Sequence, residues 1–182
     1  AGHCLRVAIS TSYWPLAWPS PEAARVTVDT AGSSIDVPLL RGEAGFKQVH
    51  FEPPQIARPM PVTVSEPHVE SREVIQDVEA QTTTMLIQRD DGRYVIEDIG
   101  TEMTCSKREE QTISRDDPDG VTTTVAWHFH YRRGAWDART QTVSTMSSDK
   151  THFHLSATVK AYDRGKLFAE RAFKESIKRD HM

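Results

Sequence analysis

The sequence contains no asparagine and only two cysteines, Cys4 and Cys105. Without asparagine there is no N-glycosylation sequon, and two cysteines this far apart form neither a CxxC metal motif nor a disulfide framework. No apolar run approaches the roughly 18 residues that a membrane-spanning helix requires, and no signal-peptide core precedes the first apolar segment. These absences favour two free thiols in a reducing compartment, and therefore a cytoplasmic protein without a membrane partner.

Motifs that would identify an enzyme are also missing. The sequence has no Gly-x-Ser-x-Gly elbow, no HExxH helix and no glycine-rich phosphate loop. The formal net charge of −4, from 22 basic and 26 acidic residues, gives no attraction toward nucleic acid. The sequence therefore predicts neither a catalytic residue nor a cofactor within this chain, and no nucleic-acid partner.

What the chain does contain is period-2 alternation of apolar and polar residues. At 182 residues and 37% hydrophobic content it is long enough for a folded domain, and alternation of this kind is typical of strands with one buried face. We expect strands at 5–10, 24–30, 33–39, 73–80, 82–89, 93–98, 102–114, 122–131, 136–146, 151–162 and 166–177. The last of these also contains good helix formers, but its apolar spacing favours a strand.

Turn signals divide the chain. Ala31-Gly32 and, more strongly, Asp91-Gly92 lie between alternating runs and predict hairpins. The prolines between residues 53 and 61 indicate an extended connector. We therefore expect terminal strands over 1–45, a Pro-rich connector over 46–67 and an antiparallel sheet over 68–182. Because short turns join successive strands, the sheet should be a meander.

An aromatic corner follows the first expected strand. It contains Tyr13, Trp14 and Trp18 among three prolines at 15, 19 and 21. Proline fixes φ and removes a hydrogen-bond donor, so the strand must end there. Large aromatic side chains in a loop are expected to pack against something. The alternatives are an interface with another domain, a plug at the end of the fold, or a pocket for a sugar or other ligand.

Two His-x-His pairs are the candidate metal ligands: His128 with His130, and His152 with His154. Histidines two apart on a strand share a face, which is half of a metal site. One strand lies between the pairs in sequence, so a sequential meander separates them by about 10 Å. Zinc ligands lie about 2 Å from the ion. We therefore favour solvent-facing histidines over a metal site.

The opening segment 2–21, GHCLRVAISTSYWPLAWPSP, resembles the C-terminal region of the CocE/NonD hydrolases, the family of cocaine esterase and X-Pro dipeptidyl-peptidases. Four further segments contribute in the same order along the chain: 115–118, 127–139, 151–162 and 178–180. The first segment is the specific one, and the others are diffuse β patterns. The resemblance therefore covers essentially the whole chain.

In that family an α/β-hydrolase domain carries a Ser-Asp-His triad, and a jelly-roll-like β domain packs beside it. The resemblance implies an all-β chain: a remnant of a jelly-roll-like sandwich followed by a curved antiparallel meander sheet. It implies a non-catalytic accessory domain whose partner is an upstream hydrolase domain of the same polypeptide, with Tyr13, Trp14 and Trp18 at the contact. A homo-oligomer is a further expected assembly.

Two other functions stay open at this stage. One is a free-standing β-sheet module that binds a small apolar or sugar ligand, and the other is a metal-dependent enzyme built on the His-x-His pairs. The substrate class of the parent hydrolase depends on residues outside this sequence.

Overall fold

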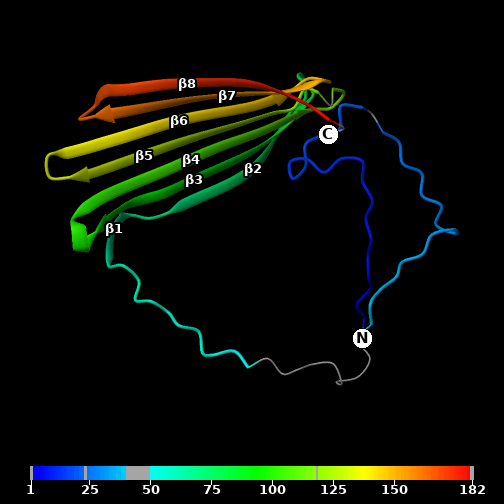
Figure 1. The fold of residues 1–182 in the computed structure, drawn as a ribbon, viewed down its shortest axis with the longest axis horizontal. Coiled ribbons are helices and arrows are strands. Elements are labelled where there is room, and N and C mark those ends of the chain that lie inside the picture. The colour runs from blue at the N-terminus through cyan, green and yellow to red at the C-terminus, as the bar shows by residue number, and fades with distance from the viewer. Residues whose placement is uncertain (1, 23, 40–49, 118, 181–182) are drawn as a thin grey trace. The chain divides into compact units, whose positions relative to one another are not determined.

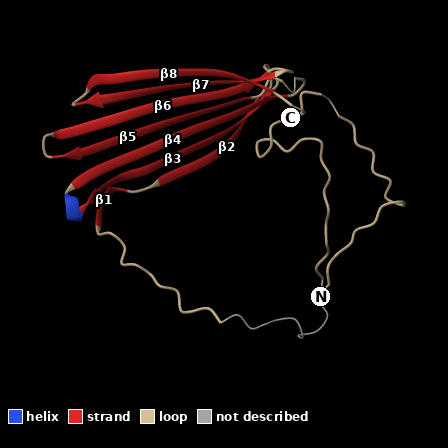
Figure 2. Ribbon diagram, viewed as in Figure 1, coloured by secondary structure: helices blue, strands red, loops and turns tan. Residues whose placement is uncertain are grey.

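The computed structural model describes residues 2–22, 24–39, 50–117 and 119–180. Figure 1 shows long strands side by side, and Figure 2 shows that a short 3-10 helix, η1 (Glu97–Ile99), is the one coloured helix among them. The strands are β1 (Val62–Glu66), β2 (Val69–Asp77), β3 (Thr82–Ile96), β4 (Thr101–Ser114), β5 (Thr122–Arg133), β6 (Trp136–Ser148), β7 (His152–Asp163) and β8 (Lys166–Lys178).

These strands form one antiparallel sheet. The strand order is β1-β3-β4-β5-β6-β7-β8, with β2 also paired to β3. From β3 onward each strand pairs with the next one in sequence, so this part is a meander. The expected all-β, antiparallel class is confirmed, and the segment 166–177 is a strand rather than a helix.

The sheet is a single layer. Among the described residues, the buried hydrophobic side chains are limited to Leu86, Ile96, Cys105 and Val121. Most side chains on β4 to β7 are half-buried, because they pack against neighbours on the same face and none of the described strands forms a second layer over them. Stability in such a sheet comes mainly from cross-strand pairs and backbone hydrogen bonds rather than from an enclosed core.

The hairpin expected at Asp91-Gly92 is wrong, because β3 continues through it. The dipeptide forms a bulge between Asp90 and Arg93, and β4 pairs with β3 on both sides of it. Gly92 has φ +74°, and its N–H donates to the Asp90 side chain at 2.8 Å. A Cβ at this position would lie 2.0 Å from the Glu66 carbonyl oxygen. The glycine is therefore required where β1 meets β3, and not for a turn.

Because of the bulge, β3 pairs with two different strands, β2 and β1, along the same edge. β2 pairs with residues 82–90 of β3, and β1 pairs with residues 93–96. The expected connector over 46–67 therefore extends too far, because residues 62–66 form β1; the described residues 50–61 before it contain no strand. The expected boundary at 45–46 lies outside the described residues.

The strands expected at 5–10, 24–30 and 33–39 are not formed within the described stretches 2–22 and 24–39. Leu5, Val7 and Ile9 are 72%, 58% and 64% exposed. A strand is stabilised by hydrogen bonds to a neighbour, and no described strand pairs with these segments. The described residues expected to form the jelly-roll-like remnant therefore have the alternating sequence of strands but no paired strand.

Residues 25–59 form a unit separate from residues 1–24 and 60–182. Within this unit the expected turn at Ala31-Gly32 is present. The Asp29 carboxylate accepts the Ala31 N–H at 3.0 Å, and the Asp29 carbonyl accepts the Ser33 hydroxyl at 2.5 Å. The turn thus forms from local side-chain bonds without producing a paired hairpin.

Candidate functional site

The aromatic corner packs on one end of the sheet. Trp18 donates its indole N–H to the Ser148 hydroxyl at 2.8 Å and meets Phe153 edge-to-face, with ring centroids 5.9 Å apart. Trp14 meets Trp18 edge-to-face at 5.2 Å. Of the three predicted corner residues, Trp18 therefore contacts β6 and β7, and Trp14 packs against Trp18. Tyr13 is exposed, and its carbonyl accepts the Ala17 N–H at 2.8 Å.

Arg179 fastens the corner to the sheet. Its side chain donates to the Pro19 carbonyl at 2.6 Å and to the Asp149 carbonyl at 2.8 Å. The guanidinium lies over the Phe153 ring at 4.8 Å, and Asp119 lies 3.5 Å from it. The residue is 5% exposed. Sequence analysis missed this role, because an arginine at a strand end carries no signal for a contact with a residue so far along the chain.

Asp149 organises the same end. Its carboxylate accepts the backbone N–H groups of Thr151 and His152 at 2.6 and 2.8 Å, and His154 Nε2 lies 2.8 Å from its other oxygen. The hydrogen bond from the Thr151 backbone, followed by those from His154 and His152, holds the pKa of Asp149 well below its usual value of 3.8. The β6–β7 turn is therefore stabilised by the ionised carboxylate.

One face of the sheet is mostly apolar, and we call it the apolar face. Directly paired residues of antiparallel strands share a face, so the register across the sheet places the following side chains together: Met85 and Ile87 of β3, Cys105 of β4, Val125, Trp127 and Phe129 of β5, Met146 of β6, Leu155 and Val159 of β7, and Phe173 of β8. The Lys107–Glu109 ion pair, at 2.7 Å, interrupts this face on β4. Burial, with Asp91 nearby, raises the pKa of the Cys105 thiol to about 11, so this thiol is un-ionised at neutral pH.

An aromatic ladder runs along the apolar face. The rings of Trp127, Phe129, Tyr131 and Trp136 stack in order with centroids 5.6, 6.3 and 6.3 Å apart. Cations lie at both ends: Lys107 is 5.7 Å from the Trp127 ring, and the Arg133 guanidinium is 5.7 Å from the Trp136 ring. Since the inner rings face each other, they present their edges outward rather than a flat stacking platform.

The opposite face is covered by polar pairs, and we call it the polar face. Glu102 bonds to both Arg93 and Arg132, and Arg93 also contacts Glu66 at 2.8 Å. The hydrogen bond from Arg132, which outweighs partial burial, lowers the pKa of Glu102. Thr84–Thr112 and Thr124–Thr145 are cross-strand hydrogen-bonded pairs on this face. The two faces therefore differ in composition: the polar face is covered mainly by charged and hydroxyl side chains, and the apolar face presents mainly hydrocarbon and aromatic side chains.

The two histidine pairs do not converge. His128 and His130 lie on β5 and His152 and His154 on β7, with β6 between them as expected. His130 contacts Asp137 at 2.9 Å, and His154 contacts Asp149 at 2.8 Å. Within the described part of the chain, no three His, Cys, Asp or Glu side chains are grouped to hold a metal ion.

A hollow lies on each face of the sheet. On the apolar face a groove of about 330 Å³ is lined by Val125, Met146, Leu155 and Phe173 together with small residues of β6 and β7. On the polar face a hollow of about 790 Å³ is lined by Glu66, Asp90, Arg108 and His128, among others. The first is a shallow apolar trough between strands, and the second is a charged surface beside the β3 bulge.

Comparisons with known proteins identify no relative. The chain matches no family model, no curated protein and no solved structure. Among the residues that the structure describes, no helix has both the length and the apolar character needed to cross a membrane.

Proposed function

We propose that this chain is a non-catalytic β domain that lays its apolar face against a neighbouring folded domain, and that this neighbour is the α/β-hydrolase domain of an esterase or X-Pro dipeptidyl-peptidase type enzyme. In this role the sheet supports the hydrolase and shapes one wall of its substrate site. The nature of the neighbour rests on the resemblance of segment 2–21 to the CocE/NonD hydrolases. A reducing, cytoplasmic setting belongs to the same proposal, since Cys4 and Cys105 are both free thiols.

The apolar face of a single-layer sheet is the observation that carries the proposal. Antiparallel sheets ordinarily pack one face on a second layer and leave the other in water. Here the polar face already has the side chains of a solvated surface, whereas Trp136, Val159 and Phe173 remain exposed on the apolar face. Exposed apolar side chains on one face of a sheet are typical of an interaction site.

The aromatic corner supports the same arrangement, because some of its side chains are packed and others are exposed. Trp18 packs on the sheet and Trp14 packs on Trp18, so these two rings fix the corner and do not form an open pocket. Tyr13 and Leu16 are exposed beside them. We therefore assign Tyr13 and Leu16 to the contact with the hydrolase domain.

A small apolar ligand is the second candidate, because of the groove beside Val125 and Phe173. Its volume of about 330 Å³ lies at the lower end of the range for ligand sites, roughly 300–1,000 Å³. A sugar is less suited to this face, since the stacked rings of the ladder leave no open ring faces for it.

The coding region upstream of residue 1 tests the proposal first. We expect an in-frame hydrolase domain with a Gly-x-Ser-x-Gly elbow. That domain, produced separately, should co-purify with the 182-residue chain, and the chain alone should not hydrolyse p-nitrophenyl esters. An upstream sequence without such a domain would overturn the proposal.

Two neighbouring substitutions locate the contact. Val125→Asp places a charge on the apolar face and should weaken co-purification with the hydrolase domain at least tenfold, because an unpaired buried charge is costly. Thr124→Asp, one residue away on the polar face, is the matched control and should leave co-purification unchanged. Circular dichroism checks that both variants keep their strands. Equal behaviour of the two folded variants would contradict the assignment of the apolar face.

A further inference from the structure

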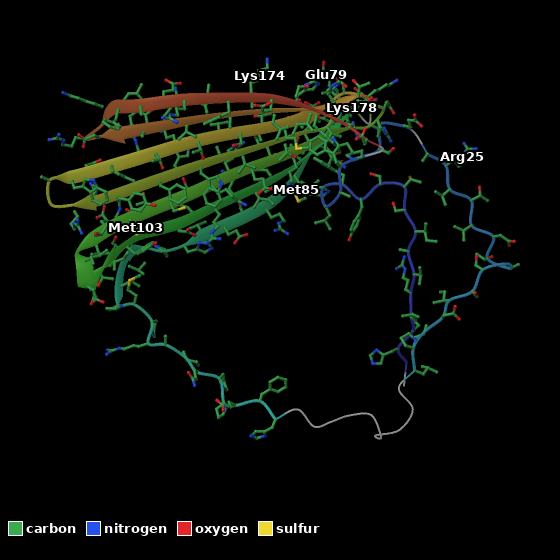
Figure 3. All side chains as sticks on the ribbon, in the orientation of Figure 1. Arg25, Glu79, Met85, Met103, Lys174 and Lys178 are labelled. Carbon is green, nitrogen blue, oxygen red and sulfur yellow. The ribbon has the colours of Figure 1, made fainter. Side chains whose placement is uncertain are left out.

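Strand β8 is an open edge with unused backbone groups. It is the last strand in the order of the described sheet, and its residues are exposed along their whole length (Figures 1 and 3). Arg179 N–H bonds to the Thr151 carbonyl, so odd-numbered residues of this segment turn their backbone groups toward β7. The N–H and C=O groups of Glu170, Ala172, Lys174 and Ser176 therefore point away from the sheet. An edge of this kind is a template for another strand.

We propose that β8 pairs with β8 of a second copy of this chain, antiparallel and with Phe173 opposite Phe173 on a two-fold axis. A two-fold axis perpendicular to a continuous sheet must place one residue opposite its own copy, since paired residues share a face. Axes at Glu170, Arg171, Lys174 or Glu175 place like charges opposite each other, which is unfavourable. Axes nearer the ends pair few residues. This leaves Ala172 and Phe173.

The Phe173 axis matches the chemistry of the strand. It pairs Arg171 with Glu175 twice and Ala169 with Ile177 twice, all on the apolar face. Phe173 and Ile177 are each 54% exposed in the single chain, and both gain a cover from the partner strand. Among the described residues neither Arg171 nor Glu175 has an ion-pair partner within the chain. Phe173 lies in a pair without direct hydrogen bonds, where opposite side chains are closest.

The competing arrangements are poorer. The Ala172 axis places Glu170 opposite Lys174, but Glu170 already pairs with Lys160 at 3.3 Å. It also places Arg171 opposite Phe173 and Glu175 opposite Ala169, so neither charge of the apolar face is matched. On the other edge of the sheet, an axis at Val74 of β2 places Glu73 opposite Ile75 and Arg72 opposite Gln76. Pairing of β8 with its own copy about a two-fold axis closes as a dimer rather than growing as a fibre. It does not depend on what covers the apolar face.

Charge reversal tests the register by sedimentation equilibrium of the full 182-residue chain. Arg171→Glu and Glu175→Arg should each raise the dimer Kd on the order of tenfold, because each places two like-charged pairs opposite one another. The double variant should restore the Kd to within about threefold, since both pairs are re-formed with opposite polarity. Lys174→Glu, which lies opposite Ala172, is the matched control and should change the Kd less than about threefold. A wild-type chain that stays monomeric, or a double variant without rescue, overturns the proposal.

Disulfide trapping provides an independent test in a Cys4→Ser background. Phe173→Cys places two thiols directly opposite at the axis, where they should oxidise to a covalent dimer that reducing agent reverses. Ala172→Cys places its thiols on a diagonal, about 7–8 Å apart, which is beyond a disulfide without backbone movement. Faster cross-linking by Ala172→Cys, or equal cross-linking by both, overturns the Phe173 register.

Discussion

Two segments of this chain alternate equally well and behave differently. Residues 5–9 alternate Leu, Val and Ile with polar or small residues, and residues 125–131 alternate Val, Trp, Phe and Tyr with Ala and His. The second segment is the centre of a ladder between β4 and β6, whereas the first is extended and exposed. Alternation describes which face a strand would bury, but the strand itself forms only where a neighbour supplies its hydrogen bonds.

The same comparison holds for turns. Asp29 and Asp149 both accept a backbone N–H two residues ahead of them. At Asp149 the flanking runs pair as β6 and β7, and at Asp29 they do not pair. Local turn chemistry is therefore compatible with either outcome, and pairing is decided by what the flanking side chains can pack against.

Gly92→Ala is expected to have the largest effect on stability, because it should separate β1 from β3. A Cβ would lie 2.0 Å from the Glu66 carbonyl, at a position with φ +74°. We expect β1 to detach and the free energy of unfolding to fall by about 3 kcal/mol. Hydrogen exchange of residues 62–66 should rise to the rate of residues 5–9. Gly134→Ala, where a Cβ meets nothing within 4 Å, is the control for the positive φ alone; equal losses in the two variants would contradict the steric explanation.

Arg179→Met should have the next largest effect, since it releases the aromatic corner from the sheet. The substitution removes the donors to Pro19 and Asp149 and keeps an apolar side chain over Phe153. We expect a loss of about 2 kcal/mol and a red shift of tryptophan fluorescence as Trp18 becomes hydrated. Lys178→Met, the exposed neighbour, should show neither change. An unshifted spectrum would mean that the corner is held by its aromatic contacts alone.

Acid titration of Asp149 should give a smaller effect that separates the two turns. The pKa of Asp149 in the folded chain lies below the usual 3.8. Its stabilising contribution is therefore complete above pH 3.8 and is lost as the pH falls from there through the folded pKa. Between pH 5 and pH 2 the wild-type Tm should therefore fall more steeply than that of Asp149→Asn. Asp29→Asn should follow the wild type, and a wild-type slope in Asp149→Asn would refute this assignment.

Ile9→Thr should have the smallest effect and would sharpen the comparison. Ile9 is exposed, so we expect a change below about 0.5 kcal/mol in the free energy of unfolding. Ile96→Thr, at a buried position where β1, β3 and β4 meet, should cost about 1–3 kcal/mol. Chemical denaturation of both variants checks this difference. A large loss in Ile9→Thr would show that residues 5–9 are paired in solution.

Sequence patterns predicted most of the sheet. The expected strands at 102–114, 122–131, 136–146, 151–162 and 166–177 match β4 to β8 within a few residues, because each has a neighbour in sequence to pair with. The continuity of β3 could not be predicted, since Asp-Gly suits a bulge as well as a turn. The outcome there depends on β4, which is long enough to hold both halves of β3 in one line.

The candidate site was predicted in part. Tyr13, Trp14 and Trp18 were singled out for their size and their prolines, and Trp18 does pack as a large aromatic residue must. Its partners Ser148, Phe153 and Arg179 come from distant strands and lack any spacing relation to it. The sequence pattern of β5 alone predicted that its two faces differ. Which residues of β7 and β8 extend the apolar face could not be predicted, because that depends on the strand register.

The contact between Arg179 and Pro19 spans 160 residues, and this has a consequence for biosynthesis. The meander can assemble strand by strand as the chain leaves the ribosome, since each strand meets the one made just before it. The aromatic corner is made early but cannot be fastened until Arg179 has emerged. Trp14 and Trp18 therefore complete their docking only after Arg179 has been synthesised.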